Sequence, residues 1–137
     1  LEKAIQGREL EISVYEYQNQ VFASLPGEIS CPSQFYSYEE KYNNQSKTQT
    51  IIKAKGLSEQ TIEKMRSCAL AAFSSLKLKD LARIDFFLSQ DGEIFLNEIN
   101  TFPGMTPISM FPKMMEANGL LFKNYLETLI KSNTDLK

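Results

Sequence analysis

The sequence predicts one α+β domain, in which a mainly antiparallel sheet packs against helices. Apolar and polar residues alternate in residues 9–17, and two further strand-like segments follow at 81–88 and 93–99. Apolar residues recur at helical spacing after Ser58 and again after Pro112. The chain of 137 residues is long enough for one domain with a modest core and too short for two.

Residues 9–17 form the first predicted strand, because their side chains alternate in character. One side carries apolar residues and the other polar ones: Leu10, Ile12 and Val14 against Glu9, Glu11 and Ser13. This pattern is typical of a half-buried strand. The polar residues 18–20 then turn the chain into a second strand at 21–25, which gives a hairpin that Pro26 and Gly27 end. The polar, aromatic-containing residues 30–50 predict a long surface loop of a kind that is often functional.

Helix signals follow in the rest of the chain. Ser58 is a good N-cap for a helix that ends near Leu76. Its apolar stripe predicts core contacts for Ile62, Met65, Ala69, Ala72, Phe73 and Leu76. We interpret Cys68 as a small buried or half-buried filler. In the tail, Pro112 suits the first turn of a short helix and Gly119 suits its C-terminal cap. A last helix would present the apolar stripe Leu121, Tyr125 and Leu129.

Composition excludes several classes of protein. The net charge of -2, from 15 basic and 17 acidic residues, fits neither a nucleic-acid-binding arm nor an acidic disordered tail. The absence of histidine removes catalytic triads and HExxH zinc sites from this chain. Cys31 and Cys68 show no metal-binding spacing, so a reducing, cytoplasmic setting is expected. The sequence contains neither a membrane-spanning apolar run nor a signal-peptide pattern.

The strand pair at 81–88 and 93–99 carries charged residues. If Asp91 and Gly92 form a two-residue turn, strand pairing places two carboxylates and two further polar groups opposite one another: Asp85 faces Glu98, and Arg83 faces Asn100. These four side chains then share one face, and the other face carries Ile84, Phe86, Leu88, Phe95 and Ile99. A four-residue loop would shift the pairs and keep the faces, whereas a three-residue loop would break the alternation.

Opposed carboxylates destabilise a sheet unless something neutralises them. A divalent cation such as Mg²⁺ is one solution, with oxygen donors from Asp85, Glu98 and Asn100. A solvated sheet face with a salt bridge from Arg83 is the other, and the local pattern favours neither. The loop at 101–110 has two prolines, a glycine and three hydroxyl side chains, so its backbone N–H groups could bind an anion or a developing oxyanion, or it could simply connect a strand to a helix.

Residues 83–112, RIDFFLSQDGEIFLNEINTFPGMTPISMFP, resemble the C-terminal signature of the D-alanine–D-alanine ligases, which belong to the ATP-grasp superfamily. The resemblance extends to LPGEI at 25–29, FYSYEEKY at 35–42 and EKAIQGRELE at 2–11, so it covers nearly the whole chain. It implies the C-terminal part of an ATP-grasp domain. The implied reaction is phosphorylation of one D-alanine by ATP, followed by attack of the amine of a second D-alanine, which yields the dipeptide for peptidoglycan.

The resemblance also implies roles for single residues. Asp85, Glu98 and Asn100 would hold two Mg²⁺ ions, with Mn²⁺ as a substitute, against the phosphates of ATP. Arg83 and the backbone N–H of Gly104 would stabilise the tetrahedral intermediate. Ser109 and the backbone of Met110 would hold the carboxylate of the second D-alanine. The implied nucleotide and loop contacts are Glu2, Lys3, Ala4 and Ile5 at the adenine, Glu9 at the ribose, Phe35 near the adenine, Lys41 at the γ-phosphate and Tyr42 over the substrates.

The resemblance covers only part of such an enzyme. The N-terminal domain and most of the central domain have no counterpart in residues 1–137, so we expect this chain to fold without catalysing the reaction. Its expected partners are ATP, D-alanine and the remainder of its own polypeptide, and the full-length enzyme is expected to be a homodimer. Two alternatives stay open: an ATP-grasp ligase for another amino or hydroxy acid, and a silent module used for binding or dimerisation.

Overall fold

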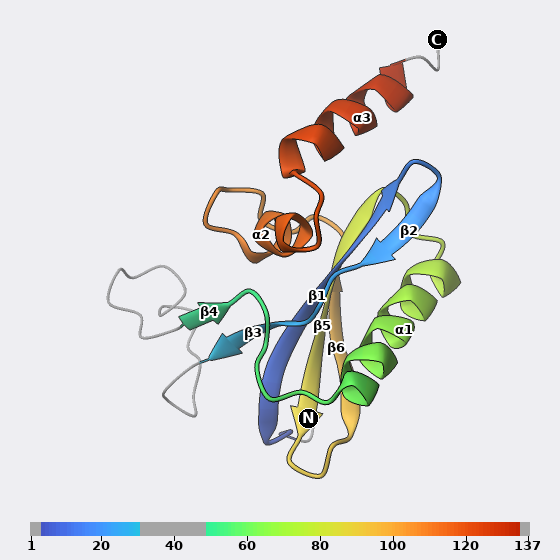
Figure 1. Ribbon diagram of the computed structural model, residues 1–137. Helices are drawn as coiled ribbons and strands as arrows, with labels where there is room; N and C mark the ends of the chain where they lie inside the picture. Colours follow the sequence, from blue (N-terminus) through green and yellow to red (C-terminus); the bar gives the residue numbers. More distant parts are fainter. Residues whose placement is uncertain (1–3, 31–48, 135–137) are drawn as a thin grey trace.

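The computed structural model describes residues 4–30 and 49–134, which form one antiparallel sheet with helices on both of its faces (Figure 1). The strands are β1 (Gly7–Tyr17), β2 (Gln20–Ala23), β3 (Gly27–Ser30), β4 (Gln49–Ile51), β5 (Leu81–Ser89) and β6 (Ile94–Asn100). They lie in the order β4-β3-β1-β5-β6, and β2 pairs with the far end of β1. The helices are α1 (Glu59–Ser75), α2 (Met110–Ala117) and α3 (Phe122–Thr134). The predicted α+β class with a mainly antiparallel sheet is confirmed.

Helix α1 covers one face of the sheet and forms the main core there. Ser58 caps its N-terminus, as predicted, by accepting a hydrogen bond from the N–H of Thr61. The buried residues between helix and sheet include Met65, Ala69 and Phe73 from α1 with Leu10, Ile12, Val14, Ile84 and Phe86 from the two long strands. The predicted stripe ends one turn early, because Leu76 is the C-cap and is 59% exposed. Cys68 is exposed, so its interpretation as a buried filler is wrong.

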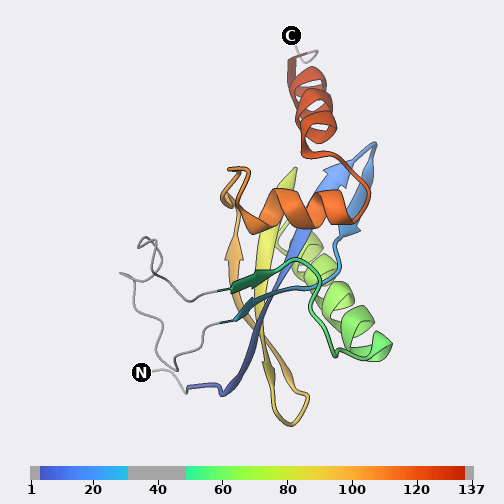
Figure 2. The ribbon, with the colours of Figure 1, turned by 60° about the vertical axis from the view of Figure 1, so that its left-hand side comes forward.

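The opposite face is covered at one end by α2 and α3, which Figure 2 shows on the side of the sheet away from α1. Their core contains Tyr15, Leu81, Phe111, Met115 and Tyr125. Pro112 lies in the first turn of α2, and Gly119 follows its C-cap with a φ of +97°, both as predicted. In the last predicted stripe, Tyr125 and Leu129 pack into this core, whereas Leu121 lies ahead of the helix and is exposed.

Strand β1 is buried on both faces, not on one face as predicted. Glu11 and Ser13 are 1% and 0% exposed, because Arg83 lies against the first and α2 lies over the second. Ser13 Oγ donates to the carbonyl of Phe111 at 3.2 Å, and Ser24 Oγ accepts from the N–H of Ser13 at 3.0 Å. Hydrogen bonds of this kind let a polar side chain be buried at little cost.

The predicted hairpin of β1 and β2 is confirmed. Tyr17 pairs with Gln20, which leaves a two-residue turn at Gln18 and Asn19. Both have positive φ angles, 50° and 64°, as a type I′ turn requires. The sequence pattern predicts neither β3 nor β4: it ends the hairpin at Pro26 and Gly27 and places residues 30–50 in a loop. These short strands are held by pairing with distant segments, Glu9 with Ile29 and Ile29 with Thr50, and not by a local pattern.

The pairing of β5 with β6 confirms the predicted partners through a different turn. Ser89 N–H donates to the carbonyl of Glu93, so the predicted two-residue turn is wrong: the loop has three residues, the length that breaks the alternation. A β-bulge then restores it: Phe86 faces Leu96 while Asp85 faces Glu98, which leaves Asn97 as the extra residue.

The three-residue loop also changes the face on which one aromatic residue lies. Phe95, predicted to lie on the core face, pairs with Phe87 and therefore lies on the face of Asp85. The side chain of Phe95 is 37% exposed. Beyond the bulge, the predicted facing of Asp85 with Glu98 and of Arg83 with Asn100 is confirmed.

None of the helices in the described residues is both long and apolar enough to cross a membrane.

Replacing Ser58 with alanine should destabilise the chain by about 1 kcal/mol, because it removes the hydrogen bond to the first turn of α1. Urea unfolding followed by circular dichroism measures this change. Ser67, exposed in the middle of the same helix, gives the matched control, and Ser67→Ala should leave the unfolding midpoint unchanged or raise it slightly. Equal destabilisation by both variants would contradict the capping role.

The chain should lose stability as the pH rises above about 10. Burial raises the pKa of Tyr125 above its usual value of 10.0, with a further rise from the charges of Asp80 and Glu16, and burial also raises that of Tyr15. Above this pH the unfolded chain releases tyrosine protons that the folded chain retains, so unfolding becomes more favourable. Unfolding midpoints at pH 8, 9.5 and 10.5 measure the slope, which Tyr125→Phe should reduce; an identical slope in that variant would contradict the assignment.

Candidate functional site

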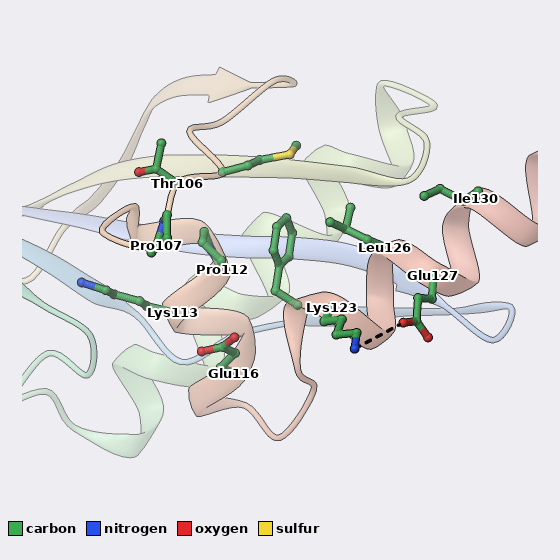
Figure 3. A pocket seen from close by; sticks show the side chains of 11 residues that line it. Thr106, Pro107, Pro112, Lys113, Glu116, Lys123, Leu126, Glu127 and Ile130 are labelled. Atoms are coloured by element: carbon green, nitrogen blue, oxygen red, sulfur yellow. Dashed lines mark ion pairs between the residues drawn. The ribbon is translucent and has the colours of Figure 1, made fainter.

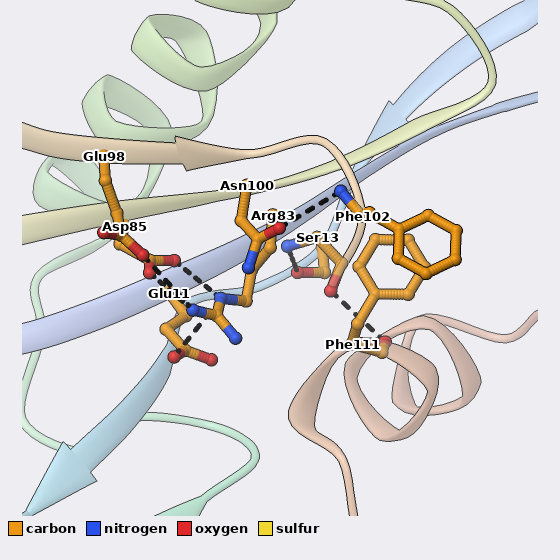
Figure 4. Close-up of polar contacts among 9 residues, drawn as sticks. Glu11, Ser13, Arg83, Asp85, Glu98, Asn100, Phe102 and Phe111 are labelled. Carbon is orange, nitrogen blue, oxygen red and sulfur yellow. Dashed lines mark hydrogen bonds and ion pairs between the residues drawn. The ribbon is translucent and has the colours of Figure 1, made fainter. Parts of the chain in front are cut away.

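Polar residues from three adjacent strands form two rows across one face of the sheet (Figure 4). In the first row Glu11 of β1 pairs with Asp85 of β5, and Asp85 pairs with Glu98 of β6. In the next row Ser13 pairs with Arg83, and Arg83 pairs with Asn100. Because side chains alternate along each strand, all six emerge on the same face. The structure thus brings together the four residues that the sequence predicted and adds Glu11 and Ser13.

Arg83 extends from its own row into the row of carboxylates. Its Nε donates to Asp85 Oδ1 at 2.8 Å and its second guanidinium nitrogen to Asp85 Oδ2 at 2.7 Å, a bidentate pair. Its Nε also lies 3.3 Å from Glu11 Oε1, and its terminal nitrogen lies 3.8 Å from Glu98 Oε1. The guanidinium therefore touches all three carboxylates.

The three carboxylates of the first row differ sharply in their exposure to solvent. Glu11 and Asp85 are 1% and 2% exposed, whereas the side chain of Glu98 is 60% exposed. Burial by itself would lower the pKa of Arg83, but its hydrogen bonds to Asp85 and the charges of Glu11, Asp85 and Glu98 outweigh this effect and raise it above the usual value. Arg83 therefore stays positively charged, and it neutralises part of a cluster with three negative groups.

The oxygen atoms of these side chains are of the kind that a hard divalent cation such as Mg²⁺ prefers. Asp85 and Glu98 face each other across the strands, and Asn100 adds an amide oxygen in the next row. Asn100 Oδ1 accepts the N–H of Phe102 at 3.1 Å and retains a second lone pair for a ligand. Each oxygen of Asp85 accepts one hydrogen bond from Arg83 and retains a lone pair, so a cation bound there would share these oxygens with the guanidinium. Among the described residues, no three Asp, Glu, His or Cys side chains form a metal site by themselves.

The loop between β6 and α2 brings Gly104 close to Ser109. A Cβ atom on Gly104 would lie 2.8 Å from Ser109 Oγ, so this approach depends on the absence of a side chain. Ser109 is the N-cap of α2, and its Oγ accepts the N–H of Thr106 at 3.1 Å. Met110, the first residue of the helix, is buried. Unsatisfied N–H groups at a helix N-terminus favour anions, which fits the predicted carboxylate contact.

The predicted nucleotide residues are only partly described. Ala4 and Ile5 precede β1, and Glu9 lies two residues before Glu11 on the same face of that strand. Glu9 is half-buried and pairs with Phe87 and Ile29 of the neighbouring strands. Glu2, Lys3, Phe35, Lys41 and Tyr42 lie outside the described residues.

Two cavities in the described part of the chain are lined by residues other than the three carboxylates of the row. One of about 480 Å³ lies between the β6–α2 loop, α2 and α3, with Met105, Phe122, Leu126 and Ile130 among its apolar walls (Figure 3). The other, of about 430 Å³, lies between the β1–β2 turn and α3 and is lined by Glu16, Asp80 and Tyr125 among others. Neither includes a residue that the sequence predicted for the site.

Sequence reasoning missed Glu11 as part of this cluster. The alternation in residues 9–17 placed Glu11 on the polar side of its strand, which was the only available signal. Its neighbour Asp85 is 74 positions further along the chain, and no local pattern shows that the two strands pair. The buried carboxylate is thus a finding of the tertiary structure.

Comparison with known proteins shows which family this chain resembles in sequence. A family model described as "D-ala D-ala ligase C-terminus" matches residues 1–131. A Tolumonas auensis protein named D-alanine–D-alanine ligase is 59% identical over 133 residues, which are 96% of this chain and 40% of that protein. The chain thus spans about 40% of the length of the curated relatives that it matches.

Solved structures give the same result. The D-alanyl-alanine synthetase A of Vibrio cholerae has a TM-score of 0.82 at 50% identity, over 94% of this chain and 40% of that one. The VanG D-Ala:D-Ser ligase of Enterococcus faecalis has a TM-score of 0.78 at 29% identity, over 94% of this chain and 37% of that one. The sequence signature, the fold and the family model agree that this chain belongs to the D-alanine–D-alanine ligase C-terminal family.

Proposed function

We propose that this chain is the C-terminal catalytic part of an ATP-dependent D-alanine–D-alanine ligase that supplies the dipeptide for peptidoglycan synthesis. The observation that carries the proposal is Arg83 held between opposed carboxylates, one row from Asn100 and beside the loop that leads to Ser109. This arrangement combines a cation-binding donor set, a fixed positive charge and a helix N-terminus on one side of a sheet. Family membership supports the same activity.

Asp85, Glu98 and Asn100 are the proposed ligands of two Mg²⁺ ions, for which Mn²⁺ could substitute. When bound, Mg²⁺ would supply positive charge that neutralises the phosphates of ATP, and these three residues would hold it beside them. The backbone at Asp85 and Asn100 is held in the ladder between β5 and β6. Rigid donors keep their geometry when the substrates arrive.

Arg83 is the proposed stabiliser of the oxyanion that forms when the second D-alanine attacks, together with the backbone N–H of Gly104. A guanidinium that is already fixed by the fold need not be ordered during the reaction, which is the basis of electrostatic stabilisation. Ser109 and the N–H of Met110 are proposed to hold the carboxylate of the second D-alanine. That position uses the free N–H groups and the positive end of α2.

The proposed nucleotide contacts are Ala4 and Ile5 at the adenine and Glu9 at the ribose. The roles predicted for Glu2, Lys3, Phe35, Lys41 and Tyr42 stay predictions. We propose that ATP and D-alanine are the small-molecule partners, that the rest of the polypeptide supplies the remaining contacts, and that the complete enzyme works in the cytoplasm as a homodimer.

A ligase with a different acceptor is the second candidate. The similarity to a D-Ala:D-Ser ligase at a TM-score of 0.78 favours it, because that protein shares this fold. Product analysis with D-alanine, D-serine and D-lactate as competing acceptors separates the two candidates.

The isolated chain should form no detectable D-alanyl-D-alanine, whereas a chimera should form it. In the chimera, residues 1–137 replace the matching 40% of the Tolumonas auensis ligase. Coupled measurement of ADP release and chromatography of the dipeptide test both proteins. Asp85→Asn should reduce kcat of the chimera by at least about 100-fold, because it removes a proposed metal ligand. Dipeptide formation by the isolated chain, or full activity of Asp85→Asn, would contradict the proposal.

Mg²⁺ with a non-hydrolysable ATP analogue should shift the NMR signals of residues 83–109 in the chimera. The shifts should disappear in the Asp85→Asn, Glu98→Gln double variant, because both proposed carboxylate ligands are then neutral. Glu93→Gln, an exposed carboxylate in the turn between the same strands, is the matched control and should leave the shifts unchanged. Equal responses of the double variant and the unaltered protein would mean that these carboxylates do not bind the metal.

A further inference from the structure

Glu11 is the most deeply buried carboxylate of the cluster, and the proposed roles leave it unused. It is 1% exposed, its Oε1 lies 3.3 Å from Arg83 Nε, and its strand position is directly opposite Asp85. Taking an ionised carboxylate out of water is costly, so a side chain in this position needs a positive partner. Arg83 supplies that positive charge on the same face.

Arg83 contacts two buried carboxylates in unequal ways. Asp85 accepts both of its close hydrogen bonds, at 2.8 and 2.7 Å, whereas Glu11 lies slightly further away. In this structure Asp85 is therefore the principal partner of the guanidinium. Glu11 is close enough to take over the same Nε–H after a shift of a few tenths of an ångström.

The proposed function places a second cation on Asp85, beside Arg83. A divalent cation on Asp85 and Glu98 would draw their oxygens toward itself and repel the positive guanidinium. The attraction of these two carboxylates for Arg83 would then weaken, although the Arg83 side chain is only 20% exposed. Glu11 is the remaining carboxylate in contact with Arg83 among the ion pairs of the described residues.

We propose that Glu11 is a positioning residue, which holds the Arg83 guanidinium in place when the Asp85 carboxylate is engaged by a cation. This inference rests on the proposed function for the roles of Arg83 and Asp85. Glu11 contacts neither substrate nor metal in this role. It keeps the positive charge at the site at the stage of the reaction when the proposed oxyanion forms.

The first test removes the Asp85 charge without using any metal. Asp85→Asn imitates an Asp85 whose charge is engaged elsewhere, and NMR measures the ¹⁵N shift of Arg83 Nε and the exchange of its proton with water. In the isolated chain, Asp85→Asn should keep a slow exchange, because Glu11 accepts the Nε–H. The Asp85→Asn, Glu11→Gln double variant should exchange about tenfold faster or more, because neither of the two carboxylates that lie near Arg83 Nε remains charged.

A matched control comes from the same sheet. Glu28 accepts two hydrogen bonds from Arg8, both at 2.8 Å, in a second carboxylate–guanidinium pair. Asp85→Asn combined with Glu28→Gln should leave the exchange at Arg83 as slow as in Asp85→Asn. Fast exchange in folded Asp85→Asn, or slow exchange in the folded Glu11→Gln double variant, would overturn the proposal.

The second test measures kinetics in the chimera. Glu11→Gln should lower kcat by about 10- to 100-fold and leave the KM for D-alanine unchanged, because a displaced Arg83 weakens the transition state more than substrate binding. Glu11→Asp, which keeps the charge, should recover part of the loss, and Glu28→Gln should leave kcat unchanged. If Glu11→Gln lowers kcat no more than Glu28→Gln does, the proposal is overturned. If one of the NMR variants does not fold, this kinetic test alone decides the role of Glu11.

The two tests also separate this inference from the proposed function. The exchange of the Arg83 proton is measured without substrate, metal or turnover. A chimera that makes no dipeptide would refute the proposed function, whereas fast exchange in Asp85→Asn would refute only the role of Glu11.

Discussion

The antiparallel pairing of β1 with β5 is the constraint on which the rest of the structure depends. It runs from Gly7 opposite Ser89 to Tyr15 opposite Leu81 and joins segments that are more than 60 positions apart. On one face it assembles the apolar residues that α1 covers, and on the other it places Glu11 beside Asp85. A one-residue shift of this register would move every side chain to the opposite face and would remove the core and the charged cluster together.

The apolar face stabilises the charged face. Leu10, Ile12 and Ile84 are fully buried under α1, and each such side chain contributes about 1.5–3 kcal/mol to folding. A buried pair such as Arg83 with Asp85 contributes little net stability, because both ions lose their hydration. The sheet can therefore hold charged groups in a fixed arrangement whose value lies in binding and electrostatics, while the opposite face supplies the stability.

Small polar contacts connect the cluster to the loop and helix that follow it. Ser13 in β1 bonds to the carbonyl of Phe111 in α2, and Asn100 at the end of β6 accepts the N–H of Phe102. Gly104 then approaches Ser109, the residue that precedes α2. Sheet, loop and helix N-terminus thus have a defined relative position, which the proposed site for two substrates and a cation requires.

The sequence by itself determined the local elements: the hairpin that turns within Gln18–Gln20 and the helix capped by Ser58. Turn residues, caps and periodicity lie within a few positions of what they control. The predicted facing of Asp85 with Glu98 holds only because a bulge at Asn97 compensates for the three-residue loop, and short-range patterns do not encode such a pair of irregularities. Strands β3 and β4, the burial of Glu11 and its contact with Arg83 were decided only by the tertiary structure, because they depend on pairing between segments far apart in the chain.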